Sequence, residues 1–270
     1  MDIITSAQNP KIKDLARLKT KAPYRKKTGF IWVEGNREMN LAIQNGYELQ
    51  QFYFNAELEN QSNIQNFEKN AQKTYAVKKE VFSKVTYRGD TEGVLGLFKI
   101  KELGLENLKN KKNPFYIILE SVEKPGNLGA VLRTADASGC DAVIVCDPHT
   151  DIFHPNVVRA SIGCCFSIDV IQADSETIID FLKKENINIF SAALQNAITY
   201  FDSDFTKGSA IVLGKESTGL TEKWRSASDQ IISIPMMGKI DSLNVSNAAA
   251  VLAYEVLRQR MKKTNAKEKP

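Results

Sequence analysis

The second half of the chain alternates apolar runs with helical segments, and this alternation constrains the fold more than any other feature. From Pro114 onward the runs read "FYIILE", "DAVIVCD", "FSIDVIQ", "INIFSAAL", "SAIVLG" and "QIISIPM". Strands that are apolar on both faces and separated by helices are typical of a parallel sheet covered on both sides. Ligands bind such sheets beyond the C-terminal ends of the strands. We therefore predict an α/β domain over residues 114–264, with its site in the loops that follow the strands. The helical segments are predicted to begin near Asn127, Asn156, Ser175, Leu220 and Ser242.

The first hundred residues have a different pattern, in which short helices and strands are mixed. Ile12, Leu15 and Leu18 recur at helical spacing in "NPKIKDLARLKT". The stretches "GFIWVEG", "YELQQFYFN" and "GVLGLFKI" read as strands, and "NREMNLAIQNG" reads as a helix. These patterns predict a small separate α/β domain over residues 1–100. Residues 101–113 are charged and predict a linker, and residues 265–270 predict a basic tail.

Positive charge is concentrated at the N-terminus. The net charge of the 270 residues is only +4, but residues 1–34 hold eight basic and three acidic side chains, a surplus of +5. A concentrated basic face attracts the phosphates of nucleic acids. The alternative is a solvated helix surface with no ligand. The basic residues are Lys11, Lys13, Arg17, Lys19, Lys21, Arg25, Lys26 and Lys27.

Several classes of protein are disfavoured by what the sequence lacks. There is no run of eighteen apolar residues and no secretory signal pattern, so we expect a cytoplasmic protein. The four cysteines lack C-x-x-C spacing, which favours buried thiols and no metal site. The sequence disfavours a hydrolase triad, because His149 and His154 are the only histidines and no G-x-S-x-G motif is present. The glycine fingerprint of a dinucleotide-binding loop is also missing.

The string "KIDSLNVSNAAA" at residues 239–250 holds more polar side chains than a helix cap needs. One N-cap requires one Asp, Ser or Asn, but five such residues stand within seven positions before an Ala-rich helix. The excess indicates a ligand. Two other strand-exit loops, "SVEKPGNLGAVLRTADASG" and "GKESTGL", are also rich in glycine and polar residues. In the first, Pro125-Gly126 is predicted to turn and Asn127 to cap the following helix.

Taken together, these loops resemble the three consecutive motifs of the SpoU (TrmH) family of RNA ribose methyltransferases. The stretches "KPGNLGAVLRTADASG", "IVLGKESTGL" and "ISIPMMGKIDSLNVSNAAAVLAYE" match in order and spacing over roughly residues 114–262. The N-terminal stretch "ITSAQNPKIKDLARLKTKAPYRKKTGFIWVEGNRE" looks like the ribosomal-protein-like, RNA-binding domain that many members carry. The resemblance implies a Rossmann-like sheet with a C-terminal trefoil knot. It also implies binding of S-adenosylmethionine and RNA, a homodimer formed through the catalytic domain, and no metal. The knot is implied by the resemblance alone, because knots are otherwise rare.

The resemblance also assigns roles to individual residues. The matching active-site positions are Asn127, Arg133, Glu216, Ser242 and Asn244, with Arg133 at the place of the arginine proposed as general base. A free guanidinium keeps its proton at ordinary pH, so Arg133 either acts with help from an RNA phosphate or only orients the hydroxyl. The expected cofactor-binding residues are Leu213, Gly214, Ile234, Ser242, Leu243 and Asn244. The expected RNA-binding residues are Arg25, Lys26, Lys27, Arg37 and Arg159, the last of which could face the dimer partner instead.

The resulting hypothesis is methylation of a ribose 2′-hydroxyl in structured RNA, with ribosomal RNA favoured by the separate N-terminal domain. Transfer RNA is the alternative substrate. A catalytically inactive RNA-binding or ribosome-assembly protein of the same fold also stays open, as does a base-methylating relative. A Rossmann-like oxidoreductase is disfavoured by the missing glycine fingerprint.

Overall fold

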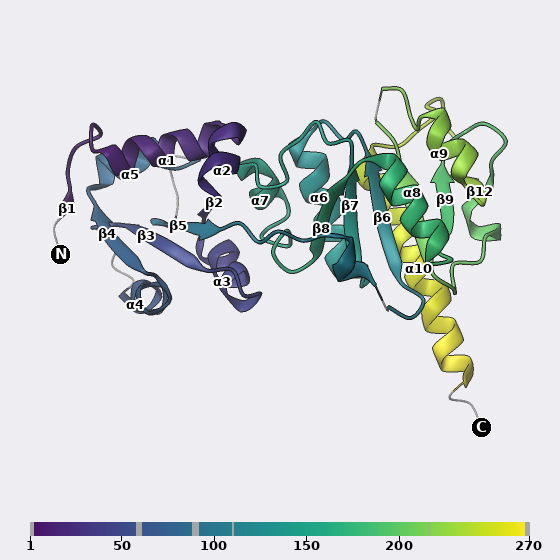
Figure 1. The fold of residues 1–270 in the computed structure, drawn as a ribbon, viewed down its shortest axis with the longest axis horizontal. Coiled ribbons are helices and arrows are strands. Elements are labelled where there is room, and N and C mark those ends of the chain that lie inside the picture. Colours follow the sequence, from purple (N-terminus) through teal and green to yellow (C-terminus); the bar gives the residue numbers. More distant parts are fainter. Residues whose placement is uncertain (1–2, 58–60, 88–91, 110, 216, 268–270) are drawn as a thin grey trace. The chain divides into compact units, whose positions relative to one another are not determined.

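The chain divides into two compact units in the computed structural model, which describes residues 3–57, 61–87, 92–109, 111–215 and 217–267 (Figure 1). The N-terminal unit comprises residues 1–102 and 151–167, and the C-terminal unit comprises residues 103–150 and 168–270. The sequence predicted one boundary between two continuous domains. Instead, residues 151–167 pack with the N-terminal unit, where the Phe166 ring meets the Tyr47 ring edge-on at 5.0 Å. An apolar ring buried in that core holds the segment there.

The N-terminal unit is built on a five-stranded mixed sheet. The strand order is β1-β4-β3-β5-β2, in which β1, β4 and β3 are parallel and β5 is antiparallel to both β3 and β2. The predicted strands are confirmed, and β1 and β4 are additional. The bounds are β1 Ile3–Ile4, β2 Phe30–Glu34, β3 Leu49–Asn55, β4 Lys73–Val77 and β5 Val94–Lys99.

Helices cover both faces of this sheet. On one face α1 and α5 bury Leu15, Leu18 and Phe82 against Trp32 and Leu97, which confirms the apolar spacing predicted for the first helix. That helix begins at Pro10 because the Asn9 side chain accepts a hydrogen bond from the Lys11 backbone N–H at 3.0 Å. The helices are α1 Pro10–Thr20, α2 Ala22–Thr28, α3 Asn36–Gln44, α4 Gln61–Asn70, α5 Lys79–Val85 and α7 Pro155–Ala160.

The C-terminal unit has a seven-stranded sheet whose described pairings are all parallel, as the unbroken apolar runs predicted. The order is β10-β12-β9-β11-β6-β7-β8. The strands β7 and β8 lie on one side of β6, and the later strands β9 to β12 lie on its other side. The order reverses between β6 and β11, where doubly wound sheets bind their ligands. The strands are β6 Phe115–Glu120, β7 Ala142–Cys146, β8 Asp169–Ala173, β9 Asn188–Ala192, β10 Ile198–Thr199, β11 Ser209–Leu213 and β12 Gln230–Ser233.

This sheet is sandwiched between two helical layers. One face packs against α8 (Ser175–Lys184) and α9 (Glu222–Ala227), with Trp224 fully buried between them and the strands. On the other face α6 (Pro125–Ser138) packs along α10 (Val245–Lys267), and α10 also contacts β11. A short 3₁₀ turn, η2, spans Tyr200–Asp202.

The predicted linker is ordered where it is described and, from Leu103 onward, belongs to the C-terminal unit. Leu108 ends a 3₁₀ turn, η1 (Leu105–Leu108), and is buried in the core, while Leu103 and Leu105 pack against the same cluster. The charged residues hid this apolar spacing, which is why the segment resembled a solvated connection. At the other end, α10 extends to Lys267 and so includes the beginning of the predicted tail.

Three further findings concern membrane spans, cysteines and metal sites. No helix among the described residues is both long and apolar enough to cross a membrane. The four cysteines are buried as free thiols, as predicted, and burial raises the pKa of Cys140 to about 12. In the described part of the chain, no cluster of three or more His, Cys, Asp or Glu side chains could hold a metal ion.

Candidate functional site

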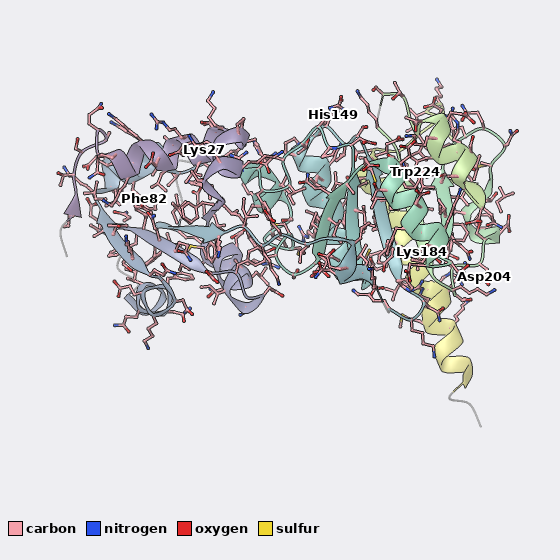
Figure 2. All side chains as sticks on the ribbon, in the orientation of Figure 1. Lys27, Phe82, His149, Lys184, Asp204 and Trp224 are labelled. Carbon is pink, nitrogen blue, oxygen red and sulfur yellow. The ribbon has the colours of Figure 1, made fainter. Side chains whose placement is uncertain are left out.

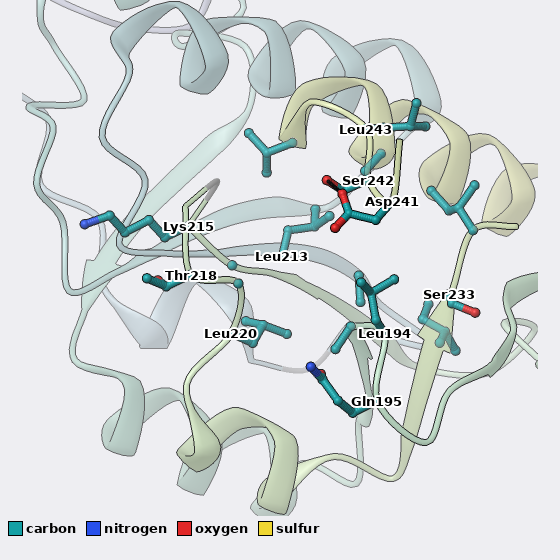
Figure 3. Close-up of a pocket in the computed structure, with 18 of the residues that line it drawn as sticks. Leu194, Gln195, Leu213, Lys215, Thr218, Leu220, Ser233, Asp241, Ser242 and Leu243 are labelled. Carbon is teal, nitrogen blue, oxygen red and sulfur yellow. Dashed lines mark hydrogen bonds between the residues drawn. The ribbon is translucent and has the colours of Figure 1, made fainter. Parts of the chain in front are cut away.

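A pocket of about 390 Å³ lies beyond the C-terminal ends of β9, β11 and β12. Most of its lining comes from four segments, to which Arg225 of α9 adds. They are residues 192–195 after β9, residues 213–215 and 217–220 after β11, residues 232–236 at the end of β12, and residues 241–248 before and within α10. The parallel sheet brings these exits together because the C-terminal ends of all its strands lie at one edge. Figure 3 shows the labelled residues of all four segments around this space.

The walls of the pocket are mainly aliphatic. Leu213, the buried last residue of β11, and the buried Leu220 both line it, and Ile234 and Leu243 add partly buried apolar surface. Five of the six residues expected to bind the cofactor therefore line one pocket: Leu213, Gly214, Ile234, Ser242 and Leu243. An aliphatic slot with a polar rim suits a planar heteroaromatic ring that carries a sugar.

The loop after β11 closes tightly on itself. The Gly219 backbone N–H donates to the Lys215 carbonyl oxygen at 2.8 Å, and Gly219 has a φ of +68°. A Cβ at Gly214 would lie 2.3 Å from the Gly219 carbonyl carbon, so no other residue fits at 214 while this loop keeps its shape. Glu216, expected in the active site, lies outside the described residues.

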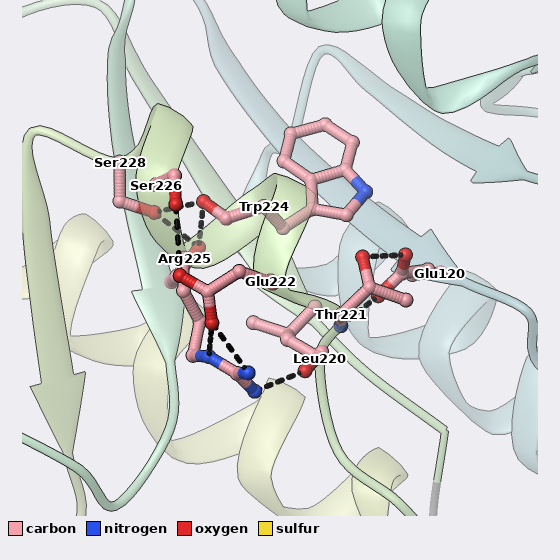
Figure 4. A network of polar contacts seen from close by, with 9 residues as sticks. Glu120, Leu220, Thr221, Glu222, Trp224, Arg225, Ser226 and Ser228 are labelled. Carbon is pink, nitrogen blue, oxygen red and sulfur yellow. Dashed lines mark hydrogen bonds and ion pairs between the residues drawn. The ribbon is translucent and has the colours of Figure 1, made fainter.

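Two carboxylates from the exit of β6 hold this loop. Glu120, the last residue of β6, accepts hydrogen bonds from the Thr221 backbone N–H at 2.8 Å and from the Thr221 hydroxyl at 2.6 Å (Figure 4). The Lys215 ammonium pairs with the Glu123 carboxylate at 2.5 Å. Hydrogen bonding to Lys215 holds the pKa of Glu123 below its ordinary value.

Some of the polar residues before α10 cap the helix, and others line the pocket. The Asn244 side-chain oxygen accepts hydrogen bonds from the Ser246 backbone N–H at 2.9 Å and the Ser246 hydroxyl at 2.7 Å, which caps the helix. Its amide donates to the Asn127 side-chain oxygen at 3.3 Å. The Ser242 hydroxyl donates to the Asp241 carboxylate at 3.1 Å, and both residues line the pocket. Asn244 itself is absent from the pocket lining, so its place is beside Asn127.

Helix α6 carries two of the expected active-site residues, although it begins earlier than predicted. Pro125 is its first residue, so Pro125-Gly126 does not form a separate turn and Asn127 is not the cap. The fixed φ of proline suits the first helical position, and this explains the earlier start. Arg133 is exposed and takes part in none of the ion pairs formed by the described residues. Its guanidinium is therefore accessible to a ligand.

The expected RNA-binding residues all belong to the N-terminal unit, and one of them is misassigned. Lys26, Lys27, Arg37 and Arg159 are exposed, with Lys27 labelled on α2 in Figure 2. Arg25 is buried, 1 % exposed, and pairs with the Asp151 carboxylate at 2.6 Å. Its expected role as an RNA contact is wrong, because it lies on the inward face of α2 and holds residues 151–167 in the unit.

Sequence reasoning missed several residues at these sites. Leu194 and Gln195 line the pocket from the exit of β9, and Thr218 and Met236 line it from the other loops. Each of them follows a predicted strand, so the sequence could predict the loop to which it belongs. It could not predict which residue of the loop faces the pocket. In the N-terminal unit, the exposed Tyr87 ring lies 5.6 Å from the Arg159 guanidinium carbon.

Comparison with known proteins identifies the two units. Residues 114–254 match the SpoU rRNA Methylase family, and residues 9–96 match the MRM3-like substrate binding domain. The chain is 30 % identical over 256 residues to the 23S rRNA (guanosine(2553)-2'-O)-methyltransferase RlmP of Bacillus subtilis, covering 95 % of this chain and 99 % of that one.

Solved structures agree with this assignment along nearly the whole chain. A crystal structure of an RNA 2'-O ribose methyltransferase has a TM-score of 0.84 at 35 % identity, covering 96 % of this chain and 100 % of the other. The AdoMet-bound rRNA methyltransferase from Sinorhizobium meliloti has a TM-score of 0.88 at 26 % identity, covering 95 % and 97 %. The match over more than half of its length shows that the chain belongs to the SpoU rRNA methylase family.

Proposed function

We propose that this protein transfers a methyl group from S-adenosylmethionine to a ribose 2′-hydroxyl of structured RNA, most specifically of 23S ribosomal RNA. The observation that carries the proposal is that several of the expected cofactor-binding and active-site residues come together at one edge of the C-terminal sheet. Five of the six predicted cofactor-binding residues line one pocket, and the sixth, Asn244, two residues beyond pocket-lining Ser242, bonds Asn127 at the start of α6. The relatives along almost the whole chain are named as 23S rRNA and RNA 2′-O-methyltransferases, which supports the same substrate class.

The residues of the pocket fit S-adenosylmethionine. Its volume of about 390 Å³ is of the size that a nucleoside with an amino-acid tail requires. Leu213, Leu243 and Ile234 would hold the adenine, and the backbone around Gly214 would bond its ring and sugar. Asp241 and Ser242 supply acceptors at the rim. When bound there, the cofactor supplies an electrophilic methyl group on a sulfonium.

The chain must then align the ribose hydroxyl and remove its proton. Asn127 and Asn244 form a polar pair that would orient the ribose, and Ser242 stands two residues before Asn244 at the pocket rim. Arg133, exposed on the same helix as Asn127, would bind the adjacent phosphate and orient the hydroxyl. An arginine retains its proton at ordinary pH, so its role as the base requires such a phosphate neighbour.

Two family features complete the proposal. The loops after β9, β11 and β12 are threaded as a trefoil knot, which the meeting of all three around one pocket supports. An atomic-resolution backbone trace of residues 193–250 would test it. The catalytic domain also forms a homodimer, supported by exposed apolar side chains on the C-terminal unit, and sedimentation of the full chain would test this. These side chains are Leu194, Ile198, Phe201, Met237 and Ile240.

The activity is tested with labelled S-adenosylmethionine and ribosomal RNA, naked and as particles, from a strain that lacks the gene. Label in one alkali-resistant dinucleotide, lost with Arg133→Ala, is the expected result. Transfer to a base, or to transfer RNA alone, would change the assignment of the substrate. Absence of cofactor binding by the wild type would overturn the enzymatic proposal.

A further inference from the structure

The loop that lines the pocket after β11 is held at both ends by acidic residues that do not themselves line the pocket. Glu120 bonds Thr221 just beyond the loop, and Glu123 pairs with Lys215 near its start. We propose that Glu120 and Glu123 are positioning residues, which fix residues 214–215 and 217–220 after β11 and thereby set the affinity of the pocket. The proposal rests on the proposed function for the identity of the ligand.

Glu120 makes the stronger attachment. Glu120 is 3 % exposed, and a buried carboxylate without donors would be costly, so its two bonds to Thr221 stabilise one position of the threonine. Both donors come from a single residue, which follows pocket-lining Leu220 directly. Figure 4 shows the pair on the far side of Leu220 from Arg225, whose guanidinium bonds the Leu220 carbonyl oxygen at 2.5 Å. Leu220 is therefore fixed from both sides.

Glu123 makes the weaker attachment. The side chains of Lys215 and Glu123 are 30 % and 46 % exposed, so water and salt screen this pair. The backbone of Glu123 is nevertheless held, because its carbonyl oxygen accepts a hydrogen bond from the buried Thr150 hydroxyl. Figure 3 shows the Lys215 amine pointing away from the pocket, which leaves its stem on the lining.

Both attachments position the same loop, because the two ends of that loop are bonded to each other. The bond from Gly219 to Lys215 joins its ends, and Gly214 packs against the backbone of Gly219 and Leu220. A shift at either end therefore moves the Leu213–Leu220 wall. Glu120 and Glu123 also stand five and two residues before Pro125, where the helix that carries Asn127 begins. The same short segment thus sets the distance between the pocket wall and the proposed ribose-binding residues.

The test compares the affinity of the full-length protein for S-adenosylmethionine by titration calorimetry. Glu120→Gln replaces one acceptor by an NH₂ group that opposes the Thr221 donors, and we expect binding to weaken about tenfold or more. Thr221→Val removes only the hydroxyl bond, so we expect a loss of roughly threefold to tenfold. Thr221→Ser keeps both donors and is expected to bind like the wild type. Glu123→Gln is expected to weaken binding about twofold to threefold at low salt, and the difference should disappear at 1 M salt.

A readout that needs no ligand separates this inference from the proposed function. We expect amide hydrogen exchange in residues 217–221 of the ligand-free protein to be faster in Glu120→Gln and Thr221→Val than in the wild type and Thr221→Ser. If Glu120→Gln does not fold, the Thr221→Val and Thr221→Ser pair decides. Equal affinity and equal exchange in that pair would overturn the inference. If the wild type fails to bind S-adenosylmethionine while the exchange difference is present, the proposed function fails and the positioning role stands.

Discussion

Each unit places a glutamate at the end of a strand, and the two have opposite surroundings. Glu120 ends β6 and receives two hydrogen bonds from one threonine. Glu34 ends β2, and burial, opposed by a bond from the Tyr87 backbone N–H at 2.7 Å, raises its pKa to about 7. Glu38, one helical turn along the chain, raises it further. In the C-terminal unit the polar groups are matched to each other and fix the backbone of a pocket. In the N-terminal unit the Glu34 carboxylate keeps a raised pKa although it accepts the Tyr87 hydrogen bond.

The strongest challenge to a pre-formed C-terminal pocket is Gly214→Ala. Its Cβ would meet the backbone of Gly219 and Leu220 at 2.3 and 2.4 Å, so the loop must open. We expect affinity for S-adenosylmethionine to fall at least about a hundredfold, since a displacement of about 1 Å is worth that much at a site. Calorimetric titration measures this. Gly238→Ala is the matched control, because a Cβ there meets nothing within 4 Å, and equal losses in the two variants would contradict the argument.

Within the N-terminal unit, Arg25 and Asp151 form a buried ion pair. Arg25→Met leaves the Asp151 carboxylate without its buried partner, and we expect the unit to lose about 3–5 kcal/mol of stability. Trp32 lies in this unit and Trp224 in the other, so denaturation followed by fluorescence in a Trp224→Phe background reports on the N-terminal unit. Lys26→Met, one residue along α2 and exposed, should leave the transition unchanged.

A third substitution distinguishes the role of Asn244 as a helix cap from its proposed role in catalysis. Asn244→Asp retains an oxygen for the Ser246 donors but loses the amide that bonds Asn127. We expect stability to change by less than about 1 kcal/mol while kcat falls roughly tenfold or more, because an equally good cap can replace Asn but the donor is gone. Asn244→Ala should lose activity and in addition about 1 kcal/mol of stability. Activity retained by the aspartate variant would reduce Asn244 to a cap.

The same contrast explains what could be predicted from the sequence. Apolar runs require burial whatever lies around them, so the strands β6, β7, β8, β9, β11 and β12 could be identified, and the exit loops followed. The two-residue strand β10 has no such run and was missed. The partners of polar side chains depend on tertiary placement. Arg25 therefore looked like its neighbours Lys26 and Lys27, and the pairing of Glu120 with Thr221, 101 residues apart, left no local signal. The packing of Leu103, Leu105 and Leu108 was hidden among charged residues for the same reason.

Exposed lysines on α2 test whether the N-terminal unit binds RNA through its surplus of positive charge. Replacing Lys26 and Lys27 together by Gln should lower the slope of log affinity for an RNA fragment against log salt by roughly 1–2, with several-fold weaker binding at low salt. Cofactor affinity should not change. Lys183 and Lys184, exposed at the end of α8 in the C-terminal unit, give the control pair. Equal changes for both pairs would mean that the whole molecule's charge, and not this surface, attracts the RNA.

The smallest expected effect concerns the cost of burying the charged carboxylate of Glu34. Its pKa rises from 4.5 in the unfolded chain to about 7, so the folded unit binds a proton that the unfolded chain has released between these values. Stability of the unit should therefore fall as pH rises from 4.5 to 7 and stay lower above pH 7. Glu34→Gln keeps an acceptor for the Tyr87 N–H without the charge. We expect it to stabilise the N-terminal unit by about 1–2 kcal/mol at pH 8 and hardly at all at pH 4.5. Urea denaturation of the Trp224→Phe protein at both values measures the difference. A gain that is equal at the two pH values would mean that charge at Glu34 costs the fold nothing, and that the two strand-end glutamates differ only in their number of hydrogen bonds.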